Sequence, residues 1–550
     1  MQEQRPVPVS ATATSILGLA EEAIARNEGG FAVTWIESDG AASSRVSWRA
    51  MWDRSAAIAR ALVDEEGVGE DRRVMLCYAP GVDFFFAFWA LLRSKVCSVP
   101  VYPPDPANLK RAIEKLDLIR SACGATLCLE DDRVRLLRKT KGRFFAWPAN
   151  LKWRSTTKIA ITTPTSPMPP FTAFSKEEQK TIAYLQFTSG TTGQPKGVIV
   201  THANLFCQIN EVLGPAGLRV LQATGASRPY VGCTWTPAWH DMGLCGGHLA
   251  PFVVGQPMVL MSPLSFLKDP GLWPRVMAAY GATWTLAPDF GFALAARRAK
   301  NGATQVDLSA LKVCHPSAER VRPASIDAFK AAYPSARGAA FIQCYGLAEN
   351  VLMATMAVDA IDGNLRLADK PGGESASPCQ KVASCGSAPF PVEVKIVDKD
   401  TRRQVAKGTT GEIWLRSPSV GEGYWNEPEL TRDVFRATLA EDDDDKTPPF
   451  YLRTGDEGFL SSEGQLYVCG RIKAMLIVAG KNVYAEDVED AAETGAGGAA
   501  RPGCIAAFGE DDADEETLVV VFEVRGRAEG NAEATAAALR DAVARDVGVR

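Results

Sequence analysis

Apolar residues recur with helical and strand-like spacing along the first two thirds of the chain. Over residues 15–350, amphipathic runs alternate with short apolar runs, which predicts an α/β architecture with mostly parallel sheets. The segment 47–62 has helical periodicity, whereas 73–78 and 98–102 are typical of buried strands. Between these strands, 84–92 is strongly apolar but only about half as long as a membrane span, so we predict a buried crossover helix.

The pattern changes near residue 380. Residues 392–397 and 411–416 alternate apolar and polar side chains with a period of two, which indicates antiparallel β-structure. Nearer the C-terminus, the sequence predicts a strand at 475–478, a hairpin across 504–524 and an alanine-rich helix at 532–544. These last three elements are expected to form a small unit of their own.

Length and composition agree with more than one domain. A chain of 550 residues and 59.1 kDa is too long for a single core, and 46% hydrophobic with 23% charged residues is an ordinary globular composition. We therefore predict an α/β protein with a large N-terminal domain, residues 1–474, and a small α+β C-terminal domain, residues 475–550. The large domain should contain stacked α/β subdomains in αβαβα layers together with a β-rich subdomain.

Charge and targeting signals exclude several classes of protein. The net charge is −5 and no dense cluster of Lys and Arg occurs, so we expect no nucleic-acid partner. The thirteen cysteines include no Cys-x-x-Cys pair, and the N-terminal residues have neither the basic start nor the apolar core of a signal peptide. We therefore expect reduced cysteines, no transmembrane segment and a cytoplasmic location.

The loop at residues 188–197, Thr-Ser-Gly-Thr-Thr-Gly-Gln-Pro-Lys-Gly, is the most informative segment of the sequence. It connects two predicted strands, 184–187 and 198–201, so the glycines lie in a hairpin turn. Glycines let backbone N–H groups approach a ligand, while hydroxyls and Lys196 offer donors and a positive charge, as polyphosphate binding requires. A Walker A pattern occurs nowhere in the chain.

Two further motifs carry candidate chemistry. His240 and Asp241 stand at the start of a predicted helix, where a histidine can line a carboxylate pocket and sense a bound acyl group. Residues 343–349 read Gln-Cys-Tyr-Gly-Leu-Ala-Glu. The ring of Tyr345 can stack on adenine, and the carboxylate of Glu349 can hold Mg²⁺ against phosphates.

A fourth motif, residues 451–459, reads Tyr-Leu-Arg-Thr-Gly-Asp-Glu-Gly-Phe. It places Asp456 in a tight turn, where its two carboxylate oxygens can accept hydrogen bonds from the two ribose hydroxyls. Arg471 follows in Gly-Arg-Ile-Lys and supplies a planar cation for ribose or phosphate oxygens.

In this order along the chain, the motifs resemble those of one family. The loop at 188–197 resembles the phosphate-binding signature of the adenylate-forming superfamily, whose members join carboxylates to AMP. Residues 240–244 (His-Asp-Met-Gly-Leu), 260–270, 287–290 and 99–104 resemble successive blocks of its fatty acyl-AMP ligase branch.

Three other segments extend this resemblance over about residues 30–550. Ala348 matches the acyl-AMP ligase form Tyr-Gly-Leu-Ala-Glu, where acyl-CoA synthetases usually carry Thr. Residues 317–322 (Ser-Ala-Glu-Arg-Val-Arg) resemble the segment that flanks the adenine, although family members more often show Gly-Ala-Glu-Pro, from which Ser317 and Arg320 depart. Residues 480–489 resemble the start of the family's C-terminal domain.

The resemblance implies an ATP- and Mg²⁺-dependent ligase that activates a fatty acid as acyl-AMP, releases pyrophosphate and passes the acyl group to the phosphopantetheine thiol of an acyl carrier protein. It makes 1–474 an AMP-binding adenylation domain and 475–550 part of the family's C-terminal domain. It implies that Thr188 and Glu349 hold Mg²⁺. The implied catalytic residues are Lys196, His240, Glu349 and Arg471. The implied nucleotide contacts are Thr188, Ser189, Gly190, Thr191, Thr192, Gly193, Lys196, Ser317, Ala318, Glu319, Tyr345, Gly346, Ala348, Asp456 and Arg471.

Two departures from the family pattern bear on activity. Members end with a Pro-Lys-Thr-x-Ser-Gly-Lys-like segment whose last lysine contacts the carboxylate and α-phosphate, whereas this sequence ends before that segment is due. We therefore expect a truncated C-terminal domain, and either a piece of a longer polypeptide or slowed adenylation. At the position of the hinge residue, usually Asp, the chain has Ala474.

Two other functions stay open. An acyl-CoA synthetase shares the first half-reaction and differs in the thiol acceptor. The acyl-AMP ligase branch carries an insertion that restrains the C-terminal domain, and we expect it at 359–385. A non-catalytic module that binds ATP or acyl-AMP is also compatible with the missing lysine segment.

Overall fold

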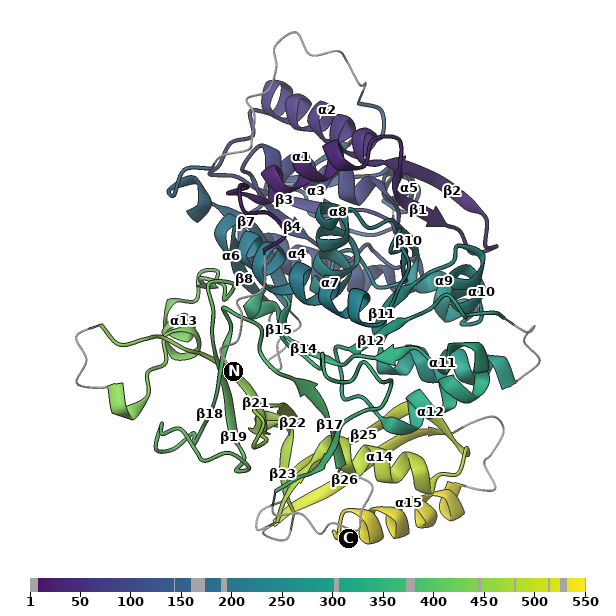
Figure 1. The fold of residues 1–550 in the computed structure, drawn as a ribbon. Coiled ribbons are helices and arrows are strands. Elements are labelled where there is room, and N and C mark those ends of the chain that lie inside the picture. Colours follow the sequence, from purple (N-terminus) through teal and green to yellow (C-terminus); the bar gives the residue numbers. More distant parts are fainter. Residues whose placement is uncertain are drawn as a thin grey trace.

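Parallel sheets covered by helices dominate the N-terminal part of the fold (Figure 1). The computed structural model describes residues 8–142, 144–159, 174–188, 195–300, 306–371, 381–442, 447–478, 481–512, 515–524 and 532–549. Up to about residue 350 the predicted α/β architecture is confirmed, because helices and strands alternate there and most strand pairs of the two large sheets are parallel.

The first sheet has seven strands, and only its last pair is antiparallel. Its order is β13 (Ala340–Phe341), β12 (Val313–Ser317), β11 (Trp284–Pro288), β9 (Gly232–Thr234), β10 (Met258–Met261), β1 (Phe31–Ile36) and β2 (Ala42–Ser47). Strands such as β10 are buried along their whole length, as parallel strands covered on both faces must be.

The second sheet also has seven strands, and it contains the hairpin predicted around residues 188–197. Its order is β20 (Gly423–Tyr424), β8 (Lys196–Thr201), β7 (Ile182–Thr188), β4 (Cys97–Pro100), β3 (Arg73–Cys77), β5 (Leu127–Glu130) and β6 (Lys152–Ser155). Strands β7 and β8 pair antiparallel, and β8 pairs on its other side with β20. Strand β4 ends two residues earlier than predicted, although the N–H of Val101 still bonds to the carbonyl of Leu76.

Helices pack around and between these two sheets. They are α1 (Ile16–Arg26), α2 (Trp48–Glu66), α3 (Asp83–Arg93), α4 (Leu109–Cys123), α5 (Asp132–Lys141), α6 (His202–Cys207), α7 (Gly214–Ala223), α8 (Ala250–Val254), α9 (Pro263–Lys268), α10 (Leu272–Ala279), α11 (Asp289–Lys300) and α12 (Pro323–Ala332). Two π-helical segments, η3 (Gln208–Leu213) and η4 (Met242–Leu249), lead into α7 and α8.

Local sequence accounts for the two helices that the periodicity predicted. Helix α2 begins after Ser47, whose side chain accepts a hydrogen bond from the N–H of Ala50, and it ends at Gly67 in the left-handed conformation. Helix α3 is apolar on all sides and lies in the core, where the Trp89 ring meets the Trp52 ring of α2 at a centroid distance of 5.9 Å. None of the described helices is both long and apolar enough to cross a bilayer.

The β-rich part follows the parallel sheets, as predicted for residues beyond 380. A six-stranded sheet has the order β16 (Leu367–Asp369), β17 (Lys381–Gly386), β22 (Leu466–Arg471), β21 (Leu452–Leu460), β19 (Gly411–Arg416) and β18 (Glu393–Val397), with antiparallel neighbours. The short hairpin of β14 (Cys344–Gly346) and β15 (Met353–Met356) lies beside it, and α13 (Pro428–Phe435) packs near β20.

The C-terminal elements pack on a small core of their own, with α14 next to the start of α12 (Figure 1). They are β23 (Met475–Val478), β24 (Lys481–Tyr484), α14 (Ala485–Gly495), β25 (Ala500–Asp512), β26 (Glu515–Val524) and α15 (Ala532–Asp546). The predicted strand, hairpin and alanine-rich helix are therefore confirmed. Leu476, Val488, Leu539 and Val543 are among the residues of this core.

Candidate active site

A cavity of about 880 Å³ lies where the β7–β8 hairpin, the ends of β11 and β12, the β14–β15 hairpin and the β21–β22 hairpin meet. Its lining has a polar part and an apolar part. The polar part includes predicted site residues and polar residues next to them in the sequence. These are Thr188, Lys196, His240, Asp241, Glu349, Glu412, Arg453, Thr454, Arg471 and Lys473. Sequence segments almost three hundred residues apart therefore face one space.

The predicted phosphate loop begins and ends at the cavity. Thr188 at the end of β7 pairs with Lys196 at the start of β8, and both residues line the cavity. Residues 189–194 lie outside the described residues, so nothing tests the predictions for Ser189, Gly190, Thr191, Thr192 and Gly193 in between. The Nζ atom of Lys196 lies 5.6 Å from the centroid of the Tyr424 ring, a cation–π distance.

Tyr424 connects this lysine to Glu349. Its hydroxyl donates a hydrogen bond of 2.7 Å to Oε1 of Glu349, and its strand β20 pairs with β8 beside Lys196. Burial raises the pKa of Glu349, and the hydrogen bond from Tyr424 acts in the opposite direction. The sequence analysis did not identify Tyr424, because a single tyrosine 75 residues from its partner has no recognisable pattern.

Tyr345, Asp456 and Arg471 form a second polar group. The Tyr345 hydroxyl donates a hydrogen bond of 2.7 Å to Oδ2 of Asp456, and Nε of Arg471 lies 3.3 Å from Oδ1 of the same carboxylate. Asp456 and Arg471 are direct partners across β21 and β22. Tyr345 and Arg471 line the cavity, whereas Asp456, 7% exposed, lies behind them. Burial raises the pKa of Asp456, and Arg471 opposes this.

Only part of the predicted adenine segment faces the cavity. Ser317 and Ala318 line the cavity, and Ala318 has a φ of 68°, a conformation that residues with a side chain rarely adopt. Glu319 points elsewhere and accepts a hydrogen bond of 2.6 Å from the N–H of Phe290. Gly346 permits the close crossing of β14 and β15, because a Cβ atom there would lie 1.7 Å from the carbonyl oxygen of Leu352.

His240 stands where predicted, just before the helical segment η4. Its Nδ1 atom lies 2.6 Å from Oδ1 of Asp241, which also accepts from the N–H of Met242 as the helix cap. The His240 side chain is 56% exposed and faces the cavity, whereas Asp241 is buried. The negative charge of Asp241 raises the pKa of His240, and desolvation partly opposes this.

The apolar part of the cavity comes from elements that the sequence analysis treated as ordinary core. The end of η3, helices α7 and α8, and strands β11 and β15 contribute it, with Leu213, Leu218, Leu221, Val254, Trp284, Leu286, Met353 and Met356 among the lining residues. Periodicity marks these side chains as buried but does not distinguish a packed interior from the wall of a cavity.

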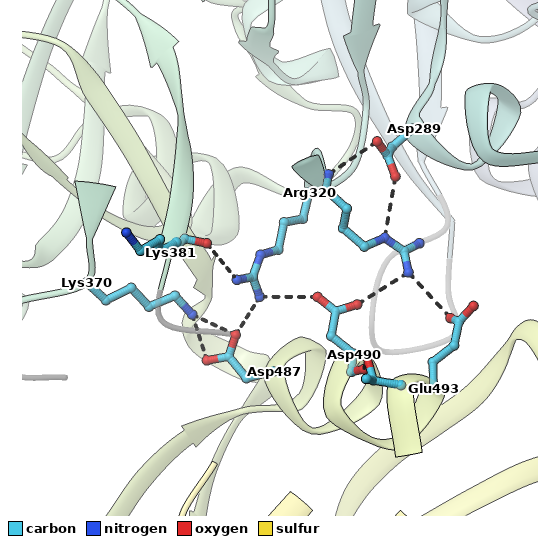
Figure 2. A network of polar contacts seen from close by, with 9 residues as sticks. Asp289, Arg320, Lys370, Lys381, Asp487, Asp490 and Glu493 are labelled. Atoms are coloured by element: carbon cyan, nitrogen blue, oxygen red, sulfur yellow. Dashed lines mark hydrogen bonds and ion pairs between the residues drawn. The ribbon is translucent and has the colours of Figure 1, made fainter. Parts of the chain in front are cut away.

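A group of ion pairs joins helix α14 to the large N-terminal part (Figure 2). The Nζ atom of Lys370 lies 2.7 Å from Oδ2 of Asp487, and Arg320 bonds to the other oxygen of this carboxylate. Lys370 is 6% and Asp487 4% exposed. Burial lowers the pKa of Lys370, although Asp487 stabilises its charged form.

A second set of contacts continues this group along the same helix. The Arg322 guanidinium lies 3.3 Å from Asp490 and 3.4 Å from Glu493, and it also contacts the buried carboxylate of Asp289 at 3.4 Å (Figure 2). Burial raises the pKa of Asp289 to about 6, against the effect of Arg322. Arg320 and Arg322 belong to the predicted adenine segment 317–322, so this segment contacts α14 directly.

Comparisons with known proteins agree with the geometry. A family model described as AMP-binding enzyme matches residues 20–425. The chain is 32% identical to the medium-chain-fatty-acid–[acyl-carrier-protein] ligase JamA of Moorena producens, over 87% of this chain and 80% of that protein. It is 29% identical to the long-chain-fatty-acid–AMP ligase FadD23 of Mycobacterium tuberculosis, over 86% and 81% of the two chains. A crystal structure of a fatty acyl-adenylate ligase from L. pneumophila, in complex with acyl adenylate and pyrophosphate, matches with a TM-score of 0.72 and 28% identity, over 98% and 91% of the chains.

The four histidines should separate clearly in an NMR titration. Burial lowers the pKa of His202 and His248 to about 3 and that of His315 to about 4, whereas Asp241 raises the pKa of His240 above 6.5. Attraction to Asp241 favours the imidazolium, so this stabilisation exists at low pH and is lost as the pH rises through the raised pKa. Asp241→Asn should lower the pKa of His240 and leave the other three unchanged. A pKa at or below 6.5 for His240 in the unmodified protein would contradict the assigned ion pair.

Proposed function

The chain belongs to the AMP-binding enzyme family, and on this basis we propose that it is a fatty acyl-AMP ligase. It is an ATP-dependent acid-adenylating ligase: it activates the carboxylate of a fatty acid with ATP and forms acyl-AMP and pyrophosphate. The observation that carries the proposal is the single cavity that joins Lys196, Tyr424 and Glu349 to an apolar wall from α7 and α8. A polyphosphate suits the first part, and an alkyl chain suits the second.

The reaction requires alignment and charge compensation more than acid–base catalysis. One carboxylate oxygen bonds to the α-phosphorus, the bond from that phosphorus to the β-bridging oxygen breaks, and pyrophosphate leaves. The nucleophile is already ionised at neutral pH, so the protein has to hold the reactants in line and neutralise negative charge. Lys196 and Arg471 supply positive charge at the cavity wall, and Lys473 lines it as well. His240 lines the acyl entrance.

Mg²⁺ and the nucleotide have suitable partners in the cavity. A hydroxyl and a carboxylate are the hard oxygen donors that Mg²⁺ prefers, so Thr188 and Glu349 would hold the ion, which would neutralise phosphate charge when bound. Tyr345, Gly346 and Ser317 would contact the adenine and Arg471 the ribose or phosphates. Asp456 would bind the ribose only if its carboxylate exchanged the bond from Tyr345 or Arg471 for the ribose hydroxyls.

We further propose a carrier-protein thiol as the acceptor and a division into domains 1–474 and 475–550. The predicted insertion 359–385 includes Lys370, whose buried ion pair with Asp487 ties this segment to α14. Residues 372–380 of the insertion lie outside the described residues. An ion pair of this kind would restrict the movement of the C-terminal domain. An acyl-CoA synthetase would need that domain to turn freely for the second half-reaction.

Pyrophosphate exchange that depends on fatty acid tests the proposed function. Lys196→Ala and Glu349→Gln should each slow the exchange, the first through phosphate positioning and the second through the metal. Loss of one charge-assisted contact in such a site costs about 2–4 kcal/mol of transition-state stabilisation, or about 30- to 1,000-fold in rate. Lys399→Ala, at an exposed lysine of the β-rich part, is the matched control and should have no effect. Unchanged exchange in both site variants would reject the assignment, and no exchange in the unmodified protein would favour a non-catalytic binding module.

Asp456→Asn should raise the KM for ATP about 10- to 100-fold and change kcat little. The substitution removes a charged acceptor, worth about 1.5–3 kcal/mol, that acts equally in the ground state and the transition state. Steady-state kinetics with varied ATP measure this. Tyr345→Phe is the companion variant, because it removes the hydroxyl bonded to Asp456 and leaves the ring. A normal KM for Asp456→Asn would mean that this carboxylate only orients Tyr345 and Arg471.

Exchange of the Lys370–Asp487 pair for apolar residues should allow acyl-CoA formation. In Lys370→Met with Asp487→Leu both buried charges are removed together, and Arg320, which also binds Asp487, keeps Asp490 as a partner at 3.6 Å, so the fold should persist. The ratio of acyl-CoA to acyl-AMP is measured with coenzyme A present, and Asp541→Asn on the exposed face of α15 serves as the control. An unchanged ratio in the double variant would show that this ion pair has no part in acceptor choice.

A further inference from the structure

Helix α7 turns one of its faces toward the cavity, and that face carries glycine among leucines. Leu213, just before the helix, and the helix residues Gly214, Gly217, Leu218 and Leu221 line the cavity at spacings of three and four, so they lie on one side. A glycine inside a helix destabilises the helix relative to alanine. Glycines in such positions therefore need a reason from packing or from function.

Packing explains Gly214 but not Gly217. A Cβ atom on Gly214 would lie 2.5 Å from the Val9 side chain and 2.6 Å from the carbonyl oxygen of Ile209, so no side chain fits there. A Cβ atom on Gly217 would meet no heavy atom within 4 Å. The space above Gly217 is part of the cavity, and the helix leaves it open without any steric need.

The walls around this space are apolar. Leu218 and Leu221 flank Gly217 on α7, and Val254 of α8 and Leu286 of β11 line the same cavity. Such a surface gives no hydrogen bonds and favours a ligand portion of methylene groups. Under the proposed function, the ligand portion with this chemistry is the alkyl tail of the fatty acid.

We infer that Gly217 determines acyl chain length: the absence of a side chain at this position leaves room for the distal methylenes of the acyl tail. The inference rests on the proposed function and deepens it, because it names the residue that limits the length of the acyl tail. A larger side chain at residue 217 fills the room from the helix side. It shortens the usable tail without altering the polar part of the cavity, where Lys196 and Glu349 lie.

The test compares the unmodified protein with Gly217→Leu over a series of saturated fatty acids of graded length. Calorimetry gives the Kd of each acid, and pyrophosphate exchange gives its kcat/KM. Gly217→Leu should bind the shortest acids normally and lose about fourfold in affinity for each methylene that the leucine displaces, equivalent to about 0.8 kcal/mol per methylene. Arg219→Leu adds the same side chain to the exposed side of α7 and should leave the profile unchanged.

Gly217→Ala separates a role in substrate length from a role in packing. It should keep or raise the Tm, because alanine favours the helix and its Cβ atom meets nothing. A lower Tm for this variant would overturn the inference, and so would equal losses for short and long acids, or an identical Kd series in Gly217→Leu and the unmodified protein. Length-dependent binding by the unmodified protein without acyl-AMP formation would reject the proposed function alone. Binding of no fatty acid by the unmodified protein would reject both.

Discussion

The pairing of β20 with β8 is the contact on which the polar part of the cavity depends. It places Tyr424 between Lys196 and Glu349, where the ring faces the lysine and the hydroxyl bonds to the carboxylate. Backbone bonds reinforce this arrangement, because the N–H of Gly421 donates to the Glu349 carbonyl and that of Trp425 donates to the Gly197 carbonyl. A buried carboxylate and a nearby cation are costly unless their geometry is fixed. Here the short strand β20 fixes the positions of both Glu349 and Lys196 relative to Tyr424.

The cavity has a polar and an apolar lining because strand ends and hairpins form one part of its wall and helix faces form the other. Its polar groups stand on strand ends and hairpins of the two parallel sheets and the β-rich sheet, where backbone turns expose side chains. Its apolar groups come from helix faces that would otherwise complete a core. A charged nucleotide and an uncharged tail can therefore occupy one continuous space, and neither has to enter an environment that suits the other.

The ion pairs of α14 illustrate a different use of buried charge. Lys370 and Asp487 are almost fully buried, so desolvation offsets much of their attraction, and the pair contributes orientation more than stability. Arg320 and Arg322 spread the contact over one face of the helix. These arginines follow the cavity-lining residues Ser317 and Ala318. One segment of backbone therefore carries both the residues that bind α14 and part of the cavity wall.

The sequence by itself determined the local elements and the identity of the chemical motifs. Ser47 caps α2, the apolar run of α3 must be buried, and the glycine-rich loop between two strands defines a hairpin at β7–β8, because these features depend on neighbouring residues. The tertiary structure decided which distant residues meet. Tyr424 reaches Glu349, Asp456 lies behind Tyr345 rather than at the cavity wall, and Gly217 is open where Gly214 is packed. Local sequence fixes the preferred backbone conformation and the spacing of hydrophobic residues. A contact between residues far apart in the sequence depends on how the layers pack, and no local residue pattern encodes that packing.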